Sequence, residues 1–285
     1  MLSLHTNNAS LSAQNSMSRT NTELSRSMTR LSTGLRINSA MDDAAGLQIA
    51  TRLKAQTSGM AVAMRNTQNS TSMLQTAEGS LDEVTNMLVR MKDLATQAAD
   101  ASSTGDDKAA MQSEYDNLGL ELKNVLQNTK FGGTKLLVGG TLASSMTFQI
   151  GASSDEKMTV DLSTDMGTIV TDVGAATSNY TTAALGTELT AAGGASTAIG
   201  NLETALKSVA KVRSSIGGAA NRLEHVYNNL SNVSTNSKAA TGLIMDVDYA
   251  TESANMTAKQ MLMQASSAML KQSNSMSSMV MSLLQ

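Results

Sequence analysis

The chain has 285 residues and a formal net charge of −3, and it contains no cysteine, proline or tryptophan. Nucleic-acid binding needs clustered Lys and Arg, while disulfides and thiolate metal sites need Cys, so the composition argues against all three. Only 2% of the residues are aromatic and 21 are methionine, which favours thin, repeated contacts between helices over a compact aromatic core.

The first predicted helix covers about residues 11–35, on a background rich in Ser, Thr and Asn. A helix with so narrow an apolar stripe depends on packing for its stability. The stripe consists of Leu11, Met17, Leu24, Met28, Leu31 and Leu35. After a short interruption, Asn38 or Ser39 is predicted to cap the next helix, with Asp42 and Asp43 in its first turn.

The second helix is predicted from about Asp43 to Asp100, because its apolar residues are spaced alternately three and four apart, as on one helical face. The strictest part of this stripe is Leu74, Ala77, Leu81, Val84, Leu88, Met91, Ala95 and Ala98. A third helix is predicted to start at Asp106 or Asp107. Its apolar face consists of Met111, Leu118, Leu122 and Val125.

The middle of the chain changes character. Short alternating segments separated by Gly, Ser and Asp predict strands and hairpins within residues 134–162. These segments are Leu136–Val138, Met146–Ile150 and Met158–Leu162. Residues 163–198 are rich in Ala, Gly, Thr and Ser, and we expect a loop or a small surface connection there.

The longest regular pattern runs from Leu202 to Ile244 and predicts a coiled-coil seam of about 60 Å. Its positions are Leu202, Ala205, Val209, Val212, Ile216, Ala219, Leu223, Val226, Leu230, Val233, Ser237, Ala240 and Ile244. Gly217 and Gly218 each cost about 1 kcal/mol relative to Ala in a helix, which predicts a close neighbouring helix or subunit. The stripe of the last helix is Ala258, Leu262, Ala265, Met269, Gln272, Met276, Met279 and Leu283.

These elements predict a mainly α fold: an elongated antiparallel coiled coil or helical bundle with a small β-hairpin region in the middle of the chain. The stripes near both termini predict that the two ends pair with each other and with copies of themselves, as in a self-assembling fibre subunit. No run of about 18 apolar residues is present, so we expect no membrane insertion. The N-terminus lacks the basic and apolar regions of a cleaved signal peptide.

No catalytic, cofactor or metal site is predicted. The pair Asp42 and Asp43 is more typical of a helix start than of acid–base chemistry. Asp246, Asp248 and Glu252 lack the glycine and the regular oxygen spacing of an EF-hand calcium loop. The two histidines are isolated from Cys and from carboxylate clusters, which argues against a metal or catalytic role.

Several longer motifs resemble those of bacterial flagellin. The N-terminal half contains RLSTGLRINSA at 30–40, DDAAGL at 42–47 and QTAEG at 75–79. The C-terminal half contains NRLE at 221–224 and DYATE at 248–252. The resemblance is specific, because two long patterns occur in the right order at opposite ends of the chain.

The resemblance implies a division into domains. A terminal coiled-coil domain, D0, would comprise residues 1–42 and 246–285. A helical bundle with β-hairpins, D1, would comprise residues 43–162 and 199–245. Residues 163–198 would be a short variable connection in the place of the outer domains of longer flagellins.

The resemblance also implies a function: a structural subunit, not an enzyme and without a cofactor, that self-assembles into the extracellular bacterial flagellar filament for motility. Export would occur unprocessed through the flagellar type III apparatus. The implied partners are further copies of the chain, flagellar cap and hook-junction proteins, and an export chaperone on the C-terminal helix, but no nucleic acid. We expect the D0 stripes to carry assembly, through Leu24, Met28, Leu31, Leu35, Leu262, Met269, Met276 and Leu283.

A second surface is implied on D1. Arg90, Leu94 and Glu114 stand at the positions where the family has a subunit contact that a host Toll-like receptor also recognises. Two alternatives remain open. A hook–filament junction protein shares the terminal helices, but it would be expected to lack this surface and the full pattern of residues 30–47. A membrane-active amphipathic protein would need more Lys and Arg on the polar faces of its terminal helices.

Overall fold

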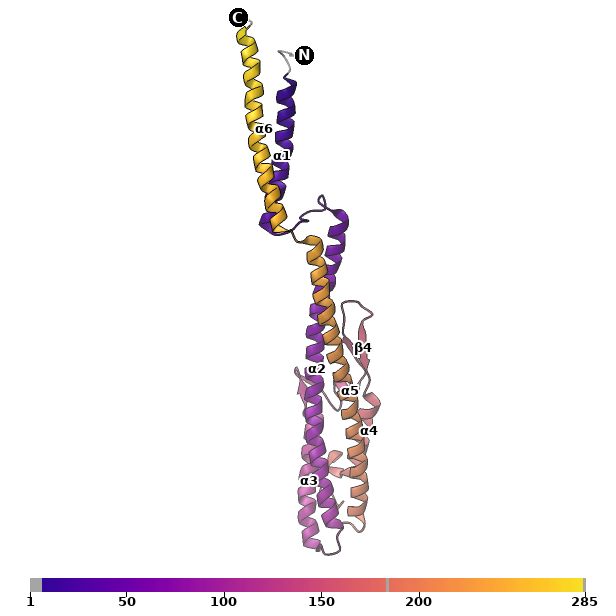
Figure 1. The fold of residues 1–285 in the computed structure, drawn as a ribbon. Coiled ribbons are helices and arrows are strands. Elements are labelled where there is room, and N and C mark those ends of the chain that lie inside the picture. The colour runs from indigo at the N-terminus through magenta and orange to yellow at the C-terminus, as the bar shows by residue number, and fades with distance from the viewer. Residues whose placement is uncertain (1–6, 183–184, 284–285) are drawn as a thin grey trace. The chain divides into compact units, whose positions relative to one another are not determined.

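The structure is a computed structural model that describes residues 7–182 and 185–283, with side chains described up to Ser275 at the C-terminal end. The chain divides into two compact units, named here the terminal unit (Met1–Thr57 and Thr235–Gln285) and the central unit (Ser58–Ser234). In chain order, the helices are α1 (Asn8–Thr33), α2 (Ala44–Ala99), α3 (Gly105–Asn128), α4 (Ser163–Ala176), α5 (Gly194–Met245) and α6 (Tyr249–Leu283) (Figure 1). The predicted mainly helical fold is confirmed. The D0 and D1 limits predicted from the sequence stay a prediction.

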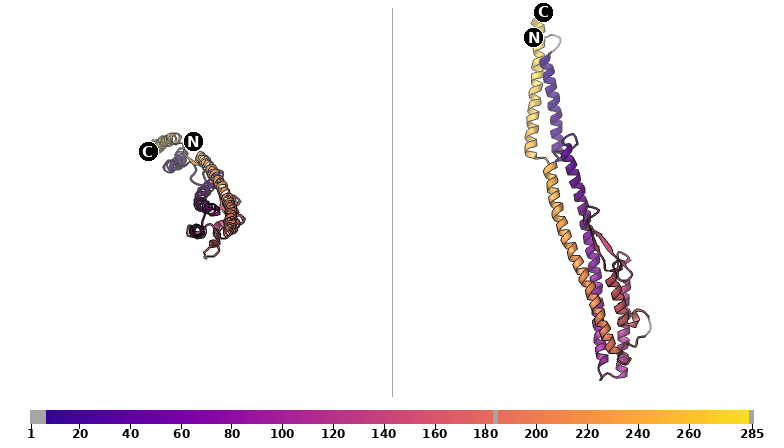
Figure 2. Two further views of the ribbon diagram at one scale, coloured as in Figure 1. Left: turned by 90° about the horizontal axis from the view of Figure 1, so that it is seen from below. Right: turned by 90° about the vertical axis from the view of Figure 1, so that its right-hand side faces the viewer.

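In the terminal unit, α1 and α6 lie side by side and antiparallel (Figures 1 and 2). Helix α1 ends at Gly34, whose φ of 73° lies in the left-handed region that favours glycine. Beyond this residue, Leu35 and Asp246 form an antiparallel bridge. The N–H of Arg36 donates to the carbonyl of Met245, the last residue of α5, at 2.6 Å. Backbone contacts thus join the segment after α1 to the segment between α5 and α6.

The start of α2 differs from the prediction. Asp43 caps this helix, because its Oδ1 accepts the N–H of Gly46 at 2.9 Å. Asn38 and Ser39 instead donate their N–H groups to Oδ2 of Asp42, at 3.2 and 3.1 Å. A turn separates them from the helix, so the cap predicted at either residue is wrong. The backbone donor of Asn38, followed by the donors of Ser39 and the charge of Arg26, lowers the pKa of the Asp42 carboxyl.

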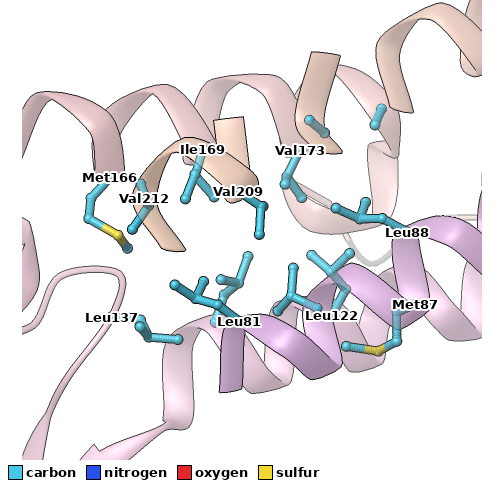
Figure 3. Close-up of a cluster of buried hydrophobic side chains, with 14 of the residues drawn as sticks. Leu81, Met87, Leu88, Leu122, Leu137, Met166, Ile169, Val173, Val209 and Val212 are labelled. Carbon is cyan, nitrogen blue, oxygen red and sulfur yellow. The ribbon is translucent and has the colours of Figure 1, made fainter. Parts of the chain in front are cut away.

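The central unit is a bundle of helices around one apolar core. The predicted stripe of α2 from Leu74 to Ala98 is buried throughout. The seam of α5 is buried from Leu202 to Leu223; from Val226 onward its predicted positions are only half-buried or exposed, with Ser234 buried in their place. Figure 3 shows side chains of α2, α3, α4 and α5 pointing into this core.

Two small hairpins follow α3. The strands are β1 (Lys130–Phe131), β2 (Thr134–Lys135), β3 (Met146–Gln149) and β4 (Lys157–Val160). Both pairs are antiparallel, and in the second Met146 lies opposite Val160. The tip of the second hairpin is held by Gln149, whose Nε2 donates to the carbonyls of Gly151 and Ser153 at 3.0 and 2.6 Å. The predicted β-hairpin region is therefore confirmed, with β3 inside one of the predicted segments and β4 overlapping another. The strand predicted at Leu136–Val138 is wrong: the first hairpin ends before it, and Leu136 and Leu137 are buried in the core from an irregular segment.

The prediction of a loop over residues 163–198 is wrong at both ends, because residues 163–176 form α4 and residues 194–198 are the start of α5. The apolar residues Met166, Ile169, Val173 and Ala176 of α4 are spaced three, four and three apart and are all buried. Thr, Gly and Asp residues separate these four apolar residues, so the average composition of the segment does not indicate a helix.

The connection from α4 to α5 is held by buried polar side chains of α3. Gln112 donates from Nε2 to Glu188 at 2.9 Å and accepts the N–H of Leu189 at 2.7 Å. Asp116 accepts the N–H of Gly186 at 3.2 Å. Two backbone N–H groups of the described part of the connection, those of Gly186 and Leu189, are thus satisfied by side chains of α3.

Two further features concern function classes. Within residues 7–182 and 185–283, no helix carries an apolar stretch long enough to cross a membrane. Over the same residues, no three His, Cys, Asp or Glu side chains are grouped to hold a metal ion. Asp248 has a structural role: its carboxylate accepts the N–H of Ala250 at 3.1 Å and the hydroxyl of Thr251 at 2.6 Å, at the start of α6.

Candidate assembly surface

Helices α1 and α6 face each other through a seam that is partly polar. The seam positions of α1 follow steps of three and four: Ser10, Ala13, Met17, Thr20, Leu24, Ser27 and Leu31. Those of α6 do the same: Glu252, Met256, Lys259, Met263, Ser266, Leu270 and Ser273. Because about half of these side chains are polar, burial of apolar area holds the pair together only weakly.

Charged groups occupy the base of this seam. The guanidinium of Arg30 lies 3.7 Å from the carboxylate of Glu252. Next along the seam, the ammonium of Lys259 donates to the hydroxyl of Ser27 at 3.0 Å and lies 4.0 Å from the carboxylate of Glu23. Such contacts are specific to one alignment of the helices, so they favour a single register.

A second face of α6 is apolar and is left open by the described part of the chain. This outward face of α6 consists of Ala254, Ala258, Met261, Leu262, Ala265 and Met269, all exposed. Leu262 is 58% exposed and Met269 is 69% exposed. At about 100° per residue, the face lies roughly 120° around the helix from the row that contacts α1, and it is about 22 Å long.

The described part of the stripe predicted for the last helix, from Ala258 to Gln272, therefore lies on the outward side of α6 and does not contact α1. Of its predicted assembly residues, Leu262 and Met269 belong to the outward face. The side chains of Met276 and Leu283 lie outside the described residues.

The predicted assembly residues of α1 fall into two groups. Leu24 is buried and Leu31 half-buried in the seam with α6, so both pack within one chain. Leu35 is half-buried at the bridge with Asp246. Met28 is exposed and remains open to a partner.

The polar half of the seam is not predicted by apolar periodicity. Glu252 and Lys259 belong to a repeat with Met256, Met263 and Leu270 that has the same three–four spacing as the outward face. A more apolar stripe with the same spacing, from Ala258 to Leu283, lies beside this repeat in the sequence, and apolar periodicity alone favours that stripe.

The predicted surface of the central unit is only partly found. Arg90 donates from Nε and Nη2 to Oε1 of Glu114 at 2.8 and 2.7 Å, and both side chains are about half exposed. Leu94 is 2% exposed, so its predicted place on the surface is wrong. It lies three residues after Met91 and four before Ala98, on the core face of α2.

Comparison with known proteins adds to this geometry. Residues 4–141 match the family model of the bacterial flagellin N-terminal helical region, and residues 199–284 match that of the C-terminal helical region. The chain is 47% identical over 163 residues to polar flagellin F of Vibrio parahaemolyticus. It is 46% identical over 162 residues to B-type flagellin of Pseudomonas aeruginosa.

Each of these alignments covers 57% of this chain but only 43% and 32% of the two relatives, respectively, so less than half of either relative is matched. The structure of a putative flagellar hook-associated protein from Vibrio parahaemolyticus aligns with a TM-score of 0.55 at 16% identity, over 72% of this chain and 99% of that one. At that identity, the likeness shows a shared fold alone.

The two family models match most of the chain, one at each end, and the matched regions contain both faces of the terminal helix pair. The resemblance inferred from the motifs is thereby confirmed. The chain belongs to the bacterial flagellin family, whose members are structural proteins of the extracellular flagellar filament and not enzymes.

Proposed function

We propose that this chain is a structural subunit of a flagellar filament, and that it assembles by packing the outward face of α6 against a terminal helix of a second copy. The observation that carries the proposal is the exposed apolar row of this face, centred on Leu262 and Met269. Uncovered apolar rows of this kind are typical of surfaces that bind another protein. Family membership favours a second copy as the occupant.

The seam between α1 and α6 supports a coupling between folding and assembly. Since about half of this seam is polar, the helix pair is marginally stable in a free chain and gains most of its stability when the outward face is covered. Trypsin should therefore cut the free chain within residues 1–40 and 246–285, at sites such as Arg19 and Lys271. Filaments should be resistant there. A free chain that resists trypsin at both ends would contradict the coupling.

Seeded growth tests the assembly proposal directly. Purified chain is added to fragments of its own filament, and elongation is followed by negative-stain electron microscopy. Failure of the wild-type chain to elongate would count against the proposed function itself.

A matched pair of variants tests the surface. Leu262→Gln removes an apolar side chain from the outward face, and Gln is a good helix former. We expect it to raise the critical concentration about three- to tenfold. Leu243→Gln makes the same change on α5, at a position that is even more exposed than Leu262, and should have little effect. If the two variants raise the critical concentration equally, the outward face of α6 is not the assembly surface.

We propose the remaining partners from the resemblance to flagellins, and the exposed face of α6 supports one of them. An export chaperone that covers α6 inside the cell would prevent premature association, and transport by the flagellar type III apparatus would leave the N-terminus uncut. Cap and hook-junction proteins would then meet the same terminal helices at the two ends of a growing filament. The mass of the filament protein tests the processing, and binding of the purified chaperone to wild type and to Leu262→Gln tests its site.

We also propose that the Arg90–Glu114 pair serves as a subunit contact, and that the free chain is recognised there by a host Toll-like receptor. The pair is exposed and joins α2 to α3, so its loss changes the surface more than the fold. Arg90→Ala in a receptor reporter assay should lower the response to the free chain. Lys157→Ala, an exposed cation on the second hairpin, is the control; equal loss from both variants would contradict the site.

A further inference from the structure

The methionines differ between the two units. In the central unit, none of the nine methionines is exposed. In the terminal unit, none of the eight methionines whose side chains are described is buried. The exposed methionines of the described residues are Met28, Met41, Met261 and Met269, and all four belong to the terminal unit.

This distribution has a chemical meaning. The chain contains no cysteine, so the methionine thioethers are its only sulfur groups, and exposure decides which of them a small oxidant in solution reaches first. A peroxide would therefore oxidise the terminal unit before the central core. Of the exposed thioethers, Met261 and Met269 lie on the outward face of α6.

We propose that Met261 and Met269 form an oxidation site at which a peroxide blocks assembly of the free chain. This inference rests on the proposed function, because it requires that the outward face be covered in the filament. In the reaction the thioether sulfur attacks one peroxide oxygen and the O–O bond breaks. The sulfur is oxidised to a sulfoxide, and the other oxygen leaves as water after proton transfer.

The consequence for assembly follows from the polarity of the product. A sulfoxide is a strong hydrogen-bond acceptor on a side chain that had been apolar, and two of them would have to be buried when a second copy covers the face. The central unit keeps its fold, because its methionines are shielded by the core. Assembly in turn shields the two thioethers, so chains already in a filament are protected.

The test combines a map of oxidation with seeded elongation. Free chain and filaments are treated with a graded dose of hydrogen peroxide, and the sulfoxide at each methionine is measured by peptide mass spectrometry. We expect Met261 and Met269 to be oxidised well before Met87 and Met91, and about tenfold more slowly in filaments than in free chain. At the dose that converts both, elongation should fall about tenfold or more, while the trypsin-resistant central unit stays intact.

Three variants locate the effect. Met261→Leu with Met269→Leu should elongate normally and keep that rate within about twofold after treatment, although every other methionine remains available. Met41→Leu, at a position 89% exposed and off the outward face, should be as sensitive as wild type. Met269→Gln, which places a polar group there without any oxidant, should slow elongation of untreated chain.

These experiments distinguish failure of the proposed function from failure of the proposed oxidation site. If untreated wild type does not elongate, the proposed function fails. If wild type elongates but the double leucine variant loses elongation after treatment as fully as wild type does, other methionines carry the effect and the inference is wrong. Unchanged elongation of wild type with both sulfoxides formed would overturn it as well.

Discussion

Glu252, in the first turn of α6, places its carboxylate 3.7 Å from the guanidinium of Arg30, in the last turn of α1. Glu252 is only 7% exposed. Arg30 Nε and Glu252 Oε1 are buried, and neither has a hydrogen-bond partner within the described part of the chain. Each charge stands at the helix end where the dipole favours it. The pair therefore favours one alignment of α1 and α6 in a seam that is otherwise held weakly.

Replacing Glu252 by Gln should therefore loosen the terminal helix pair. The change keeps the size of the side chain but leaves the guanidinium of Arg30 without its counter-charge, at a cost of about 1–3 kcal/mol. We expect faster hydrogen exchange in α1 and α6 of assembled filaments and a higher critical concentration. Glu23→Gln removes a more exposed carboxylate, 4.0 Å from Lys259, and is the control. If the two variants exchange alike, the pair does not fix the register.

Gly217 and Gly218 offer a test with two opposite readouts. A Cβ added at either position would meet nothing within 4 Å, so no close neighbour among residues 7–182 and 185–283 accounts for these glycines. Gly217→Ala and Gly218→Ala should each stabilise α5 by up to about 1 kcal/mol, measured by urea unfolding of the free chain. If a second copy packs closely there, the same variants will elongate more slowly. Normal elongation by the stabilised variants would show that no second copy packs closely against Gly217 and Gly218.

Much of the fold could be predicted because two helices carry unbroken apolar repeats. The stripe from Leu74 to Ala98 and the seam from Leu202 to Leu223 bury their residues as predicted, since long periodic faces have few alternative ways to pack. Helix α4 could not be predicted in this way. Its face has only four apolar residues, and burial against the core decides its conformation more than local propensity does.

The candidate site shows a different limit of sequence reasoning. Helix α6 carries two repeats of the same spacing, and only the structure shows that the more polar one, through Glu252 and Lys259, contacts α1. Buried charges become acceptable when partners such as Arg30 stand opposite, and those partners are more than 200 residues away in the sequence. Family positions alone could not assign Leu94 to the core or the surface, because its burial depends on which face of α2 packs against the other helices.

Alanine substitutions of Leu94 and Arg90 should differ strongly in their effect on stability. Leu94→Ala removes a buried side chain from the core of the central unit and should lower the free energy of unfolding by about 2–5 kcal/mol. Arg90→Ala breaks an exposed ion pair and should lower it by less than about 1 kcal/mol. Urea unfolding of both variants checks this contrast. A small effect of Leu94→Ala would mean that its side chain is not packed as described.

The network around Glu188 predicts acid sensitivity of the α4–α5 connection. Burial opposes ionisation of this carboxyl, but the N–H and the hydroxyl of Ser178, together with the amide of Gln112, outweigh it and lower its pKa. A carboxyl whose pKa is lower in the folded than in the unfolded chain stabilises the fold above its unfolded pKa of about 4.3, and that contribution is lost as the pH falls through the folded pKa.

Glu188→Gln should accordingly lower the stability of the full chain at pH 7 by less than about 1 kcal/mol, since the carboxyl is partly open to solvent. The difference from wild type should shrink as the pH falls below about 4.3. Urea unfolding at pH 7, 5 and 3.5 measures both effects, with Glu121→Gln, an exposed carboxyl on α3, as the control. A difference that persists unchanged at pH 3.5 would show that the variant acts through shape and not through the charge of Glu188.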